Sequence, residues 1–273
     1  MKATRTVIEP QSNFSLRLHE LWQYRELFYF FTWRDIKVKY KQTYLGILWS
    51  IIQPLFLMLL FTLVFARHFS PVSNSIDYKS FVLSALILWT LFYSATSHAA
   101  ESIITQVSII KKIYFPRLII IGSAILTALF DFFVAFIIFL LFCIFFRQHI
   151  SWQAIFLFPA GILMILLSAF GIGSLLAALN VKFRDFRYAL PFLLQLLFFS
   201  SQVVYPLKDI EQPWLKQALS LNPVNGAIEI FRGALTLEFD LQVIFTGLFM
   251  AIVLCISGLI YFRKTEAYFA DLA

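Results

Sequence analysis

The sequence predicts an all-α protein that crosses a membrane several times. First, 60% of the 273 residues are hydrophobic and 14% are charged, with a mean hydropathy of +0.82, whereas soluble domains carry about 25% charged residues. Second, apolar runs long enough to cross the ~30 Å hydrocarbon core of a bilayer recur along the chain. Third, Lys and Arg gather on one side of these runs. Together these observations argue against a soluble domain.

Six apolar runs are predicted to be membrane-spanning helices, and they divide the chain into three regions. The runs lie at 44–66, 80–100, 118–146, 153–180, 188–204 and 241–262. The fifth is short and has Pro191 near its start, where a missing N–H costs least. About 40 residues precede the first run, so we expect it to stay in the mature chain rather than to be a cleaved signal peptide. The predicted regions are an amphipathic cytoplasmic N-terminal region (1–43), a six-helix transmembrane domain (44–262) and a cytoplasmic tail (263–273).

The distribution of charge orients the predicted helices. With both termini on one side of the membrane, 16 of the 22 Lys and Arg residues fall on that side and 6 on the other. The positive-inside rule therefore predicts that both termini are cytoplasmic. This topology explains the isoelectric point near 9.4. Nucleic acid is not an expected partner, because the cations are divided among separate segments, and membrane lipids are their nearest anions.

The N-terminal region from Phe14 to Lys41 is predicted to form an amphipathic helix lying in the membrane interface. Apolar, aromatic and charged side chains alternate there at roughly helical spacing, and Ser15 is a candidate N-cap. Four cations come just before the first apolar run: Arg34, Lys37, Lys39 and Lys41. Anchoring to lipid headgroups is one explanation for them. For Gly46 and Pro54 two interpretations are open, a bend in the chain or close helix packing.

Two cytoplasmic connections have unusual compositions. The segment 101–117 is apolar enough to form a helix, yet it carries three cations and stops at Pro116. An apolar helix outside the membrane needs a surface to bury against, either the protein's own bundle or a soluble partner. The segment 180–188 is a short basic and aromatic turn, which positive charge on the cytoplasmic side explains sufficiently.

Asp131 falls near the middle of the third predicted span. A lone carboxylate at that depth is costly and is by default a functional hypothesis. A proton-coupled carrier, however, normally shows several ionisable groups within its spans, and this sequence shows one. Two roles are therefore open, a part in transport or a helix contact in which Asp131 is protonated or bonds to Ser or Thr on a neighbouring helix.

The region 205–240, on the opposite side from the termini, is predicted to form a pair of short helices. Its first helix is 213–219, and Asn222 and Pro223 provide an N-cap and a first-turn proline for the second. Both helices are too short to cross the bilayer, which suggests a re-entrant or surface-lying hairpin.

The sequence carries no recognisable catalytic, nucleotide-binding or metal-binding motif. It contains no G-x-x-x-x-G-K-[ST], H-E-x-x-H, G-x-S-x-G or C-x-x-C pattern. Cys143 and Cys255 lie singly in apolar runs, where each acts as a small hydrophobic residue. Gly171 and Gly173 indicate a close helix contact rather than a nucleotide fingerprint. No catalytic residue or metal site is predicted, so the energy for any transport is expected to come from elsewhere.

Four motifs resemble those of the membrane subunit of type-two ABC exporters for bacterial polysaccharides. They are RDIKVKYKQTYLGILW at 34–49 followed by Pro54, IKKIYFPR at 110–117, NVKFRDFR at 180–187 and NPVNGAIEIFR at 222–232. The resemblance covers nearly the whole chain in order. It is greatest to the permeases for lipid-linked O-antigen, with teichoic acid and capsule permeases as more distant relatives.

The resemblance implies an assembly in the bacterial inner membrane. Such permeases are homodimers of six-span subunits, joined by two copies of a cytoplasmic ABC ATPase subunit. ATP and Mg bind that partner, so no cofactor is expected in this chain. The implied cargo is a polysaccharide linked to a polyprenyl lipid, undecaprenyl, through a pyrophosphate group.

The resemblance also implies roles for particular residues. The segment 101–117 is implied to be a coupling helix that docks on the ATPase through Ile109, Ile110, Lys111, Lys112, Tyr114 and Arg117. An entrance for the lipid pyrophosphate is implied at Arg34, Lys37, Lys39, Lys41, Tyr44, Leu45 and Gly46. Aromatic residues on the first and fifth spans are implied to line the sugar channel: Trp49, Phe56, Phe198, Phe199 and Tyr205. The 205–240 hairpin is implied to form part of the outer gate.

Two alternative functions stay open at this point. One is an ABC permease for a drug or a small lipid. The other is an integral membrane glycosyltransferase or polyprenyl-phosphate enzyme, which needs paired acidic residues at an interface. The acidic residues Glu101, Asp185, Asp209 and Glu211 show no such pattern in the sequence.

Overall fold

The computed structural model describes residues 18–41, 43–44, 46–67, 76–183, 185–266 and 269, and this part of the chain is helical. The helices are α1 (Leu18–Gln23), α2 (Arg25–Lys41), α3 (Leu48–Phe65), α4 (Tyr78–Thr105), α5 (Val107–Ile110), α6 (Leu118–Phe145), α7 (Ala154–Lys182), α8 (Phe186–Phe199), the 3-10 helix η1 (Leu207–Asp209), α9 (Pro213–Ser220), α10 (Pro223–Thr236) and α11 (Leu241–Glu266).

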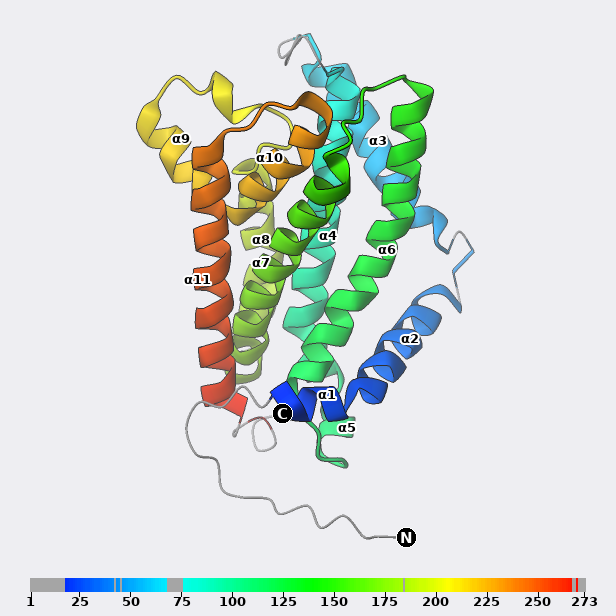
Figure 1. Cartoon of the computed structure of the whole chain (residues 1–273). Helices are drawn as coiled ribbons and strands as arrows, with labels where there is room; N and C mark the ends of the chain where they lie inside the picture. The colour runs from blue at the N-terminus through cyan, green and yellow to red at the C-terminus, as the bar shows by residue number, and fades with distance from the viewer. Residues whose placement is uncertain are drawn as a thin grey trace.

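Five helices, α3, α4, α6, α7 and α11, are long and apolar enough to cross a membrane. The helices α4 and α7 pack against each other, α6 packs against α4, and α11 packs against α7 (Figure 1). In the most apolar stretch of each helix, 78% of the residues are buried in α4 and only 6% in α3, which lies on the outside against α4 and α6. These helices match five of the six predicted spans.

The sixth predicted span corresponds to α8, which ends earlier than expected. Its 14 residues extend ~21 Å, less than the ~30 Å of the hydrocarbon core. The helix stops at Phe199 because side chains at the start of α10 make hydrogen bonds to the residues that follow it. The Asn225 amide donates to the Ser200 carbonyl at 3.0 Å, and the Asn222 amide donates to the Ser201 hydroxyl at 3.0 Å. A helix can end away from water where such partners satisfy its carbonyls. A complete crossing by α8 stays a prediction.

The helices α9 and α10 form the pair of short helices predicted between α8 and α11. The Asn222 side chain caps α10 by accepting from the Val224 N–H at 3.1 Å, and Pro223 occupies the first turn, as predicted. The apolar face of α10 is buried and comprises Val224, Ala227, Ile228, Phe231, Ala234 and Leu235. Since α10 packs against α4, α7 and α11, it is part of the bundle.

Glycines allow α7 to approach its neighbours closely. A Cβ at Gly171 would lie 2.5 Å from backbone atoms of Leu254 and Cys255 on α11, and one at Gly173 would lie 2.6 Å from the Ala99 Cβ on α4. The predicted close helix contact is therefore confirmed, and it joins α7 to two different helices.

The N-terminal region forms two helices where the sequence predicted one. The chain breaks at Tyr24, so that α1 lies across the end of the bundle and α2 rises along α6 (Figure 1). Phe28 on α2 fits against Gly122 on α6, where an added Cβ would lie 2.4 Å from the Phe28 ring. The predicted capping residue Ser15 lies outside the described residues.

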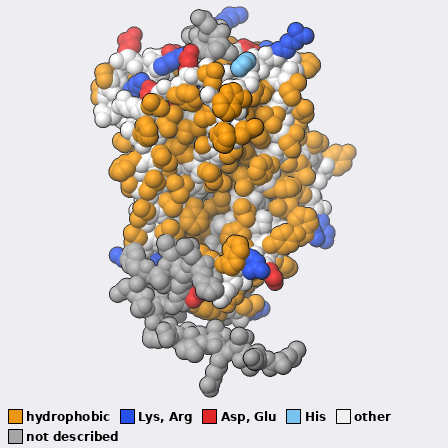
Figure 2. All heavy atoms as spheres, viewed as in Figure 1, with side chains coloured by type: hydrophobic (Ala, Val, Ile, Leu, Met, Phe, Trp, Pro, Cys, Tyr) orange, Lys and Arg blue, Asp and Glu red, His pale blue; other side chains and the backbone are white. Residues whose placement is uncertain are grey.

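The described beginning and end of the chain lie at one end of the bundle, together with α5 and the start of α6 (Figure 1). The Phe31 and Phe115 rings are 5.6 Å apart, and the Arg117 backbone N–H donates to Glu266 Oε1 at 3.4 Å. The visible face in Figure 2 has hydrophobic side chains across its middle and charged side chains toward both ends. Such an apolar band with polar ends is the surface expected of a membrane-spanning bundle.

Candidate functional site

A cavity of about 190 Å³ with several polar side chains in its wall lies where the turn between α2 and α3 meets α4 and α6. Its polar lining residues include Lys39, Tyr40, Ser50, Gln53, Ser94 and Asp131, and Trp49 and Phe132 contribute apolar surface. The cavity therefore brings together three parts of the sequence that were singled out separately: a cation of the N-terminal region, the turn at Gly46 and the carboxylate of the third span. Polar groups gathered at this depth are a functional hypothesis by default.

Asp131 lies at the middle of the 28-residue α6 and is 9% exposed. The Lys39 Nζ and the Tyr40 hydroxyl both donate to its carboxylate, so two consecutive residues of α2 are fastened to α6. Burial and the hydrogen bond to Asp131 raise the pKa of Tyr40, so its phenol stays a protonated donor. Asp131 thus makes a helix contact, but its partners are Lys39 and Tyr40 rather than Ser or Thr.

The backbone at Gly46 explains why a glycine stands at the turn before α3. Its φ of +45° lies in the left-handed region, which glycine adopts without strain. The nearest atom to an added Cβ would be Thr43 Oγ1 at 3.7 Å, so close packing is not the reason. Of the two open interpretations, the structure supports the bend. Pro54 is buried within α3, which continues through it.

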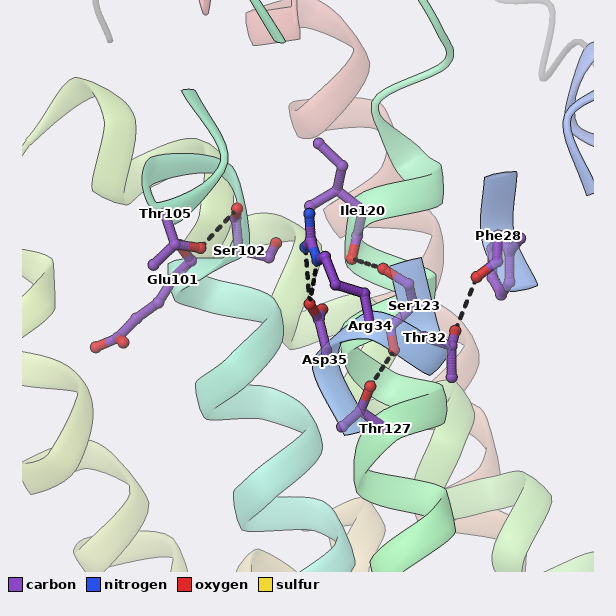
Figure 3. Close-up of polar contacts among 10 residues, drawn as sticks. All are labelled: Phe28, Thr32, Arg34, Asp35, Glu101, Ser102, Thr105, Ile120, Ser123 and Thr127. Carbon is purple, nitrogen blue, oxygen red and sulfur yellow. Dashed lines mark hydrogen bonds and ion pairs between the residues drawn. The ribbon is translucent and has the colours of Figure 1, made fainter. Parts of the chain in front are cut away.

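Apart from Lys39 and Gly46, the predicted entrance residues that the structure describes do not line the cavity. Figure 3 shows that Arg34 bonds to its neighbour Asp35, with Nε and Nη2 at 2.9 and 2.7 Å from Asp35 Oδ1. Lys37 lies over the Trp33 ring at 5.1 Å. Lys41 and Tyr44 are exposed, and Leu45 lies outside the described residues. Of the four predicted cations, only Lys39 lines the cavity.

The hydroxyl groups near Arg34 are occupied within their own helices. In Figure 3, Thr32 donates to the Phe28 carbonyl at 2.9 Å, and Thr127 donates to the Ser123 carbonyl at 2.9 Å. Ser123 in turn donates to the Ile120 carbonyl at 2.8 Å, and Thr105 donates to the Ser102 carbonyl at 3.0 Å. These hydroxyls on α2, α4 and α6 therefore already donate within their own helices.

The predicted channel aromatics divide into two groups. Phe198 contacts Phe61 on α3 and Trp89 on α4, with ring centroids 5.9 and 5.3 Å away. Phe199 is exposed, and its carbonyl accepts from the Tyr205 hydroxyl at 2.9 Å. Phe198 therefore lies where α3, α4 and α8 meet, and Phe199 and Tyr205 bond to each other at the end of α8. Trp49 and Phe56 lie on the exposed side of α3, where Trp49 also lines the cavity.

The predicted docking segment 101–117 is not a single helix. The end of α4 continues to Thr105, the four-residue α5 follows, and the chain then turns ahead of Pro116. Ile109 and Ile110 are half-buried and pack on the core, so the bundle itself covers them. Lys111, Lys112 and Tyr114 are exposed, and the Arg117 guanidinium lies 5.6 Å from the Phe269 ring centroid.

Ile113 extends the exposed part of this segment, although the sequence did not single it out. Its side chain is 62% exposed, the same fraction as Tyr114. Because Ile109 and Ile110 pack on the core, Ile113 and Tyr114 provide the apolar surface that this segment leaves exposed, beside Lys111 and Lys112.

Several polar residues of the site were also missed by the sequence reasoning. Tyr40 stands among cations in the sequence, and nothing there indicates that it reaches the same carboxylate as Lys39, because neighbouring residues of a helix point to different sides. Gln53 and Ser94 were passed over because single polar residues in apolar runs are common.

Comparisons with known proteins indicate the same family of membrane transporters as the four sequence motifs. Residues 26–236 match the family described as ABC-2 type transporter. The O-antigen export system permease protein RfbA of Myxococcus xanthus is 30% identical over 76% of this chain and 79% of its own length. A protein of the same name from Klebsiella pneumoniae is 27% identical over 88% of this chain and 92% of its own length. The polysialic acid transport protein KpsM of Escherichia coli is 25% identical over 86% of this chain and 92% of its own length.

Proposed function

Because the chain belongs to the ABC-2 type transporter family, we propose that it is the membrane permease of an ATP-driven exporter of bacterial polysaccharide. One observation carries the proposal: the family match covers α2 to α10, and the similar proteins named for O-antigen export align over most of the chain. The cargo is an O-antigen-like glycan linked to undecaprenyl pyrophosphate. It moves from the cytoplasm across the inner membrane.

The energy for export comes from a separate ATPase. Two ATPase subunits, which bind ATP and Mg, meet two copies of this permease. The exposed segment of Lys111, Lys112, Ile113 and Tyr114 supports a docking surface at the end of the bundle that holds α1 and α5. Apolar side chains beside cations suit a partner groove with an apolar floor and an acidic rim. This end is cytoplasmic in the proposed orientation.

The cavity at Lys39 is the proposed place where the lipid pyrophosphate enters. An ammonium group makes charge-assisted hydrogen bonds to phosphate oxygens. The chain turns at Gly46, which lines the same cavity as the Lys39 ammonium. Aromatic faces for the sugar chain are then provided by Trp49, Phe56, Phe198, Phe199 and Tyr205. Aromatic rings stack on pyranose C–H surfaces without selecting one hydroxyl pattern, which suits a channel for a repeating glycan.

The first test is co-purification of the full chain with the ABC ATPase encoded beside it, followed by ATP turnover of the complex. The variant Lys111→Glu with Lys112→Glu reverses two charges next to Ile113 and Tyr114. We expect it to lower the recovered ATPase or the turnover of the complex about tenfold, because two favourable contacts become repulsive.

The matched control reverses two exposed cations at the opposite end, Arg147→Glu with Lys208→Glu. We expect assembly and turnover close to the unmodified complex. If no ATPase co-purifies with the unmodified chain, the exporter proposal is wrong. If both double variants behave alike, the docking surface lies elsewhere.

A further inference from the structure

The ion pair between Lys39 and Asp131 stands in an unusual place, at the wall of a cavity and halfway along an apolar helix. Removing charges from water is unfavourable, and well-packed apolar side chains often hold helices together at least as well. Helix packing alone therefore gives no reason for a charged pair here.

The two partners differ in how firmly they are held. The Asp131 side chain is 12% exposed, whereas the Lys39 side chain is 38% exposed and lines the cavity. Asp131 also accepts a second hydrogen bond, from the Tyr40 hydroxyl. If Lys39 moves away, the Asp131 carboxylate therefore still accepts the hydrogen bond from Tyr40.

Further side chains with donor groups line the same cavity as Lys39, and some of these donors are already in use. The Ser50 and Thr90 hydroxyls bond to carbonyls of their own helices, at 2.6 and 2.7 Å. The side chains of Gln53 and Ser94 make no hydrogen bond within the part of the chain that the structure describes, so their donors remain available. An ammonium with nearby amide and hydroxyl donors is suited to an anion with several oxygens, such as a phosphate.

We propose that Asp131 is a built-in substitute for the cargo's phosphate. It holds Lys39 while the entrance is empty, and the arriving pyrophosphate takes its place. A carboxylate and a phosphate offer the ammonium the same kind of charge-assisted N–H···O contact, so the exchange trades one partner for another. This inference deepens the proposed function and rests on it. The exchange also removes one of the two hydrogen bonds that join the end of α2 to Asp131 on α6, so loading of cargo weakens this contact while Tyr40 stays bonded.

The test compares two substitutions that break the same ion pair. The permease–ATPase complex in lipid nanodiscs is titrated with a C15 polyprenyl pyrophosphate, and its Kd is measured. We expect Lys39→Met to weaken binding about tenfold, because a charge-assisted contact to phosphate is lost. We expect Asp131→Asn to tighten binding severalfold, because the competing carboxylate is gone. Arg25→Met, an exposed cation on the same helix and away from the cavity, serves as the matched control.

Opposite signs for the two variants support the proposal. If both weaken binding alike, the pair only holds the site in shape and the proposal fails. The swap Lys39→Asp with Asp131→Lys restores the ion pair, so we expect it to recover the unmodified Tm without recovering binding. A swap that recovers both would overturn the proposal.

Two further outcomes separate this inference from the proposed function. If the probe does not bind the unmodified complex while ATPase assembly is intact, the inference fails and the permease function stands. Inorganic pyrophosphate is the second probe. Binding of inorganic pyrophosphate as tight as that of the polyprenyl form would overturn a lipid headgroup as the ligand.

Discussion

Asn225 joins three segments of the chain by four hydrogen bonds. Its Oδ1 accepts from the Gln202 N–H at 2.7 Å, and its amide donates to the carbonyls of Ser200 and Leu219 at 3.0 and 2.8 Å. Its own carbonyl accepts from the Gln202 side chain at 2.9 Å. Asn225 is fully buried, so a single side chain satisfies the ends of both α8 and α9 away from water.

Replacement of Asn225 by Leu is expected to be strongly destabilising. The change leaves the Gln202 N–H and the Ser200 carbonyl without partners, at about 1–3 kcal/mol for each buried unsatisfied group, and it removes one of the two donors to the Leu219 carbonyl. The measurement is the Tm of the purified chain in detergent, and we expect a clear fall. Gln217→Leu, a similar change on the exposed side of α9, is the control and should leave Tm nearly unchanged. Equal Tm values for the two variants would contradict this account.

At the scale of elements, α7 and α11 approach each other closely. A Cβ at Gly258 would lie 2.1 Å from the Gly171 carbonyl oxygen and 2.8 Å from the Ser174 hydroxyl. Since the nearer atom belongs to the backbone, a side chain at Gly258 can be accommodated only if the helices separate. Within a membrane, such close contact provides the van der Waals attraction that replaces the hydrophobic effect.

Gly258→Val is therefore expected to separate α7 from α11. Overpacking of this kind costs about 1–3 kcal/mol, so Tm in detergent should fall and the yield of folded protein should decrease. Ser257→Val adds similar bulk at an exposed position of the same helix and should be tolerated. A Gly258→Val protein as stable as the Ser257→Val protein would show that the contact is not tight.

The sequence predicts the long helices well, because hydropathy over about 20 residues is a local property. The ends of elements depend on distant partners. The end of α8 is determined by Asn222 and Asn225, more than 20 residues later in the chain. The break at Tyr24 and the division of the segment 101–117 have no comparable hydropathy signal. Helix boundaries were accordingly less well predicted than the helices themselves.

The candidate site shows the same division between local and distant information. Lys39, Gly46 and Asp131 were each recognised from the sequence, for separate reasons. Their meeting in one cavity was not predicted, because Lys39 and Asp131 are 92 positions apart. The cations Arg34, Lys37 and Lys41 have the same charge as Lys39 but lie on other sides of α2. The charge of a residue does not indicate which side of a helix reaches a cavity.

At the scale of the whole molecule, α3 is the least buried of the long helices. It packs on α4 and α6 with one side and presents a row of large apolar side chains on the other. The exposed row comprises Leu48, Trp49, Ile52, Phe56, Leu59, Leu60, Leu63 and Val64. In the proposed homodimer, we expect this surface to meet the second copy, which would place the Lys39 cavity close to the boundary between subunits.

Cysteine cross-linking tests this arrangement. In a chain whose Cys143 and Cys255 have been replaced, Leu59→Cys on α3 is expected to give a disulfide-linked dimer in native membranes, because the two α3 helices face each other. Ile256→Cys, equally exposed on α11, is the control and should stay monomeric on the gel. A dimer only with Ile256→Cys would assign the subunit contact to α11 instead.

The dependence of α8 on α10 also constrains the order of biogenesis. The Ser200 carbonyl receives its donor from a residue that is synthesised 25 positions later. Until that residue leaves the ribosome, the end of α8 has an unpaired carbonyl, which is costly in lipid and harmless in water. During synthesis, which proceeds from the N-terminus, the helices α3, α4, α6 and α7 can therefore assemble first. The end of α8 settles into the bundle only as α10 folds back into it.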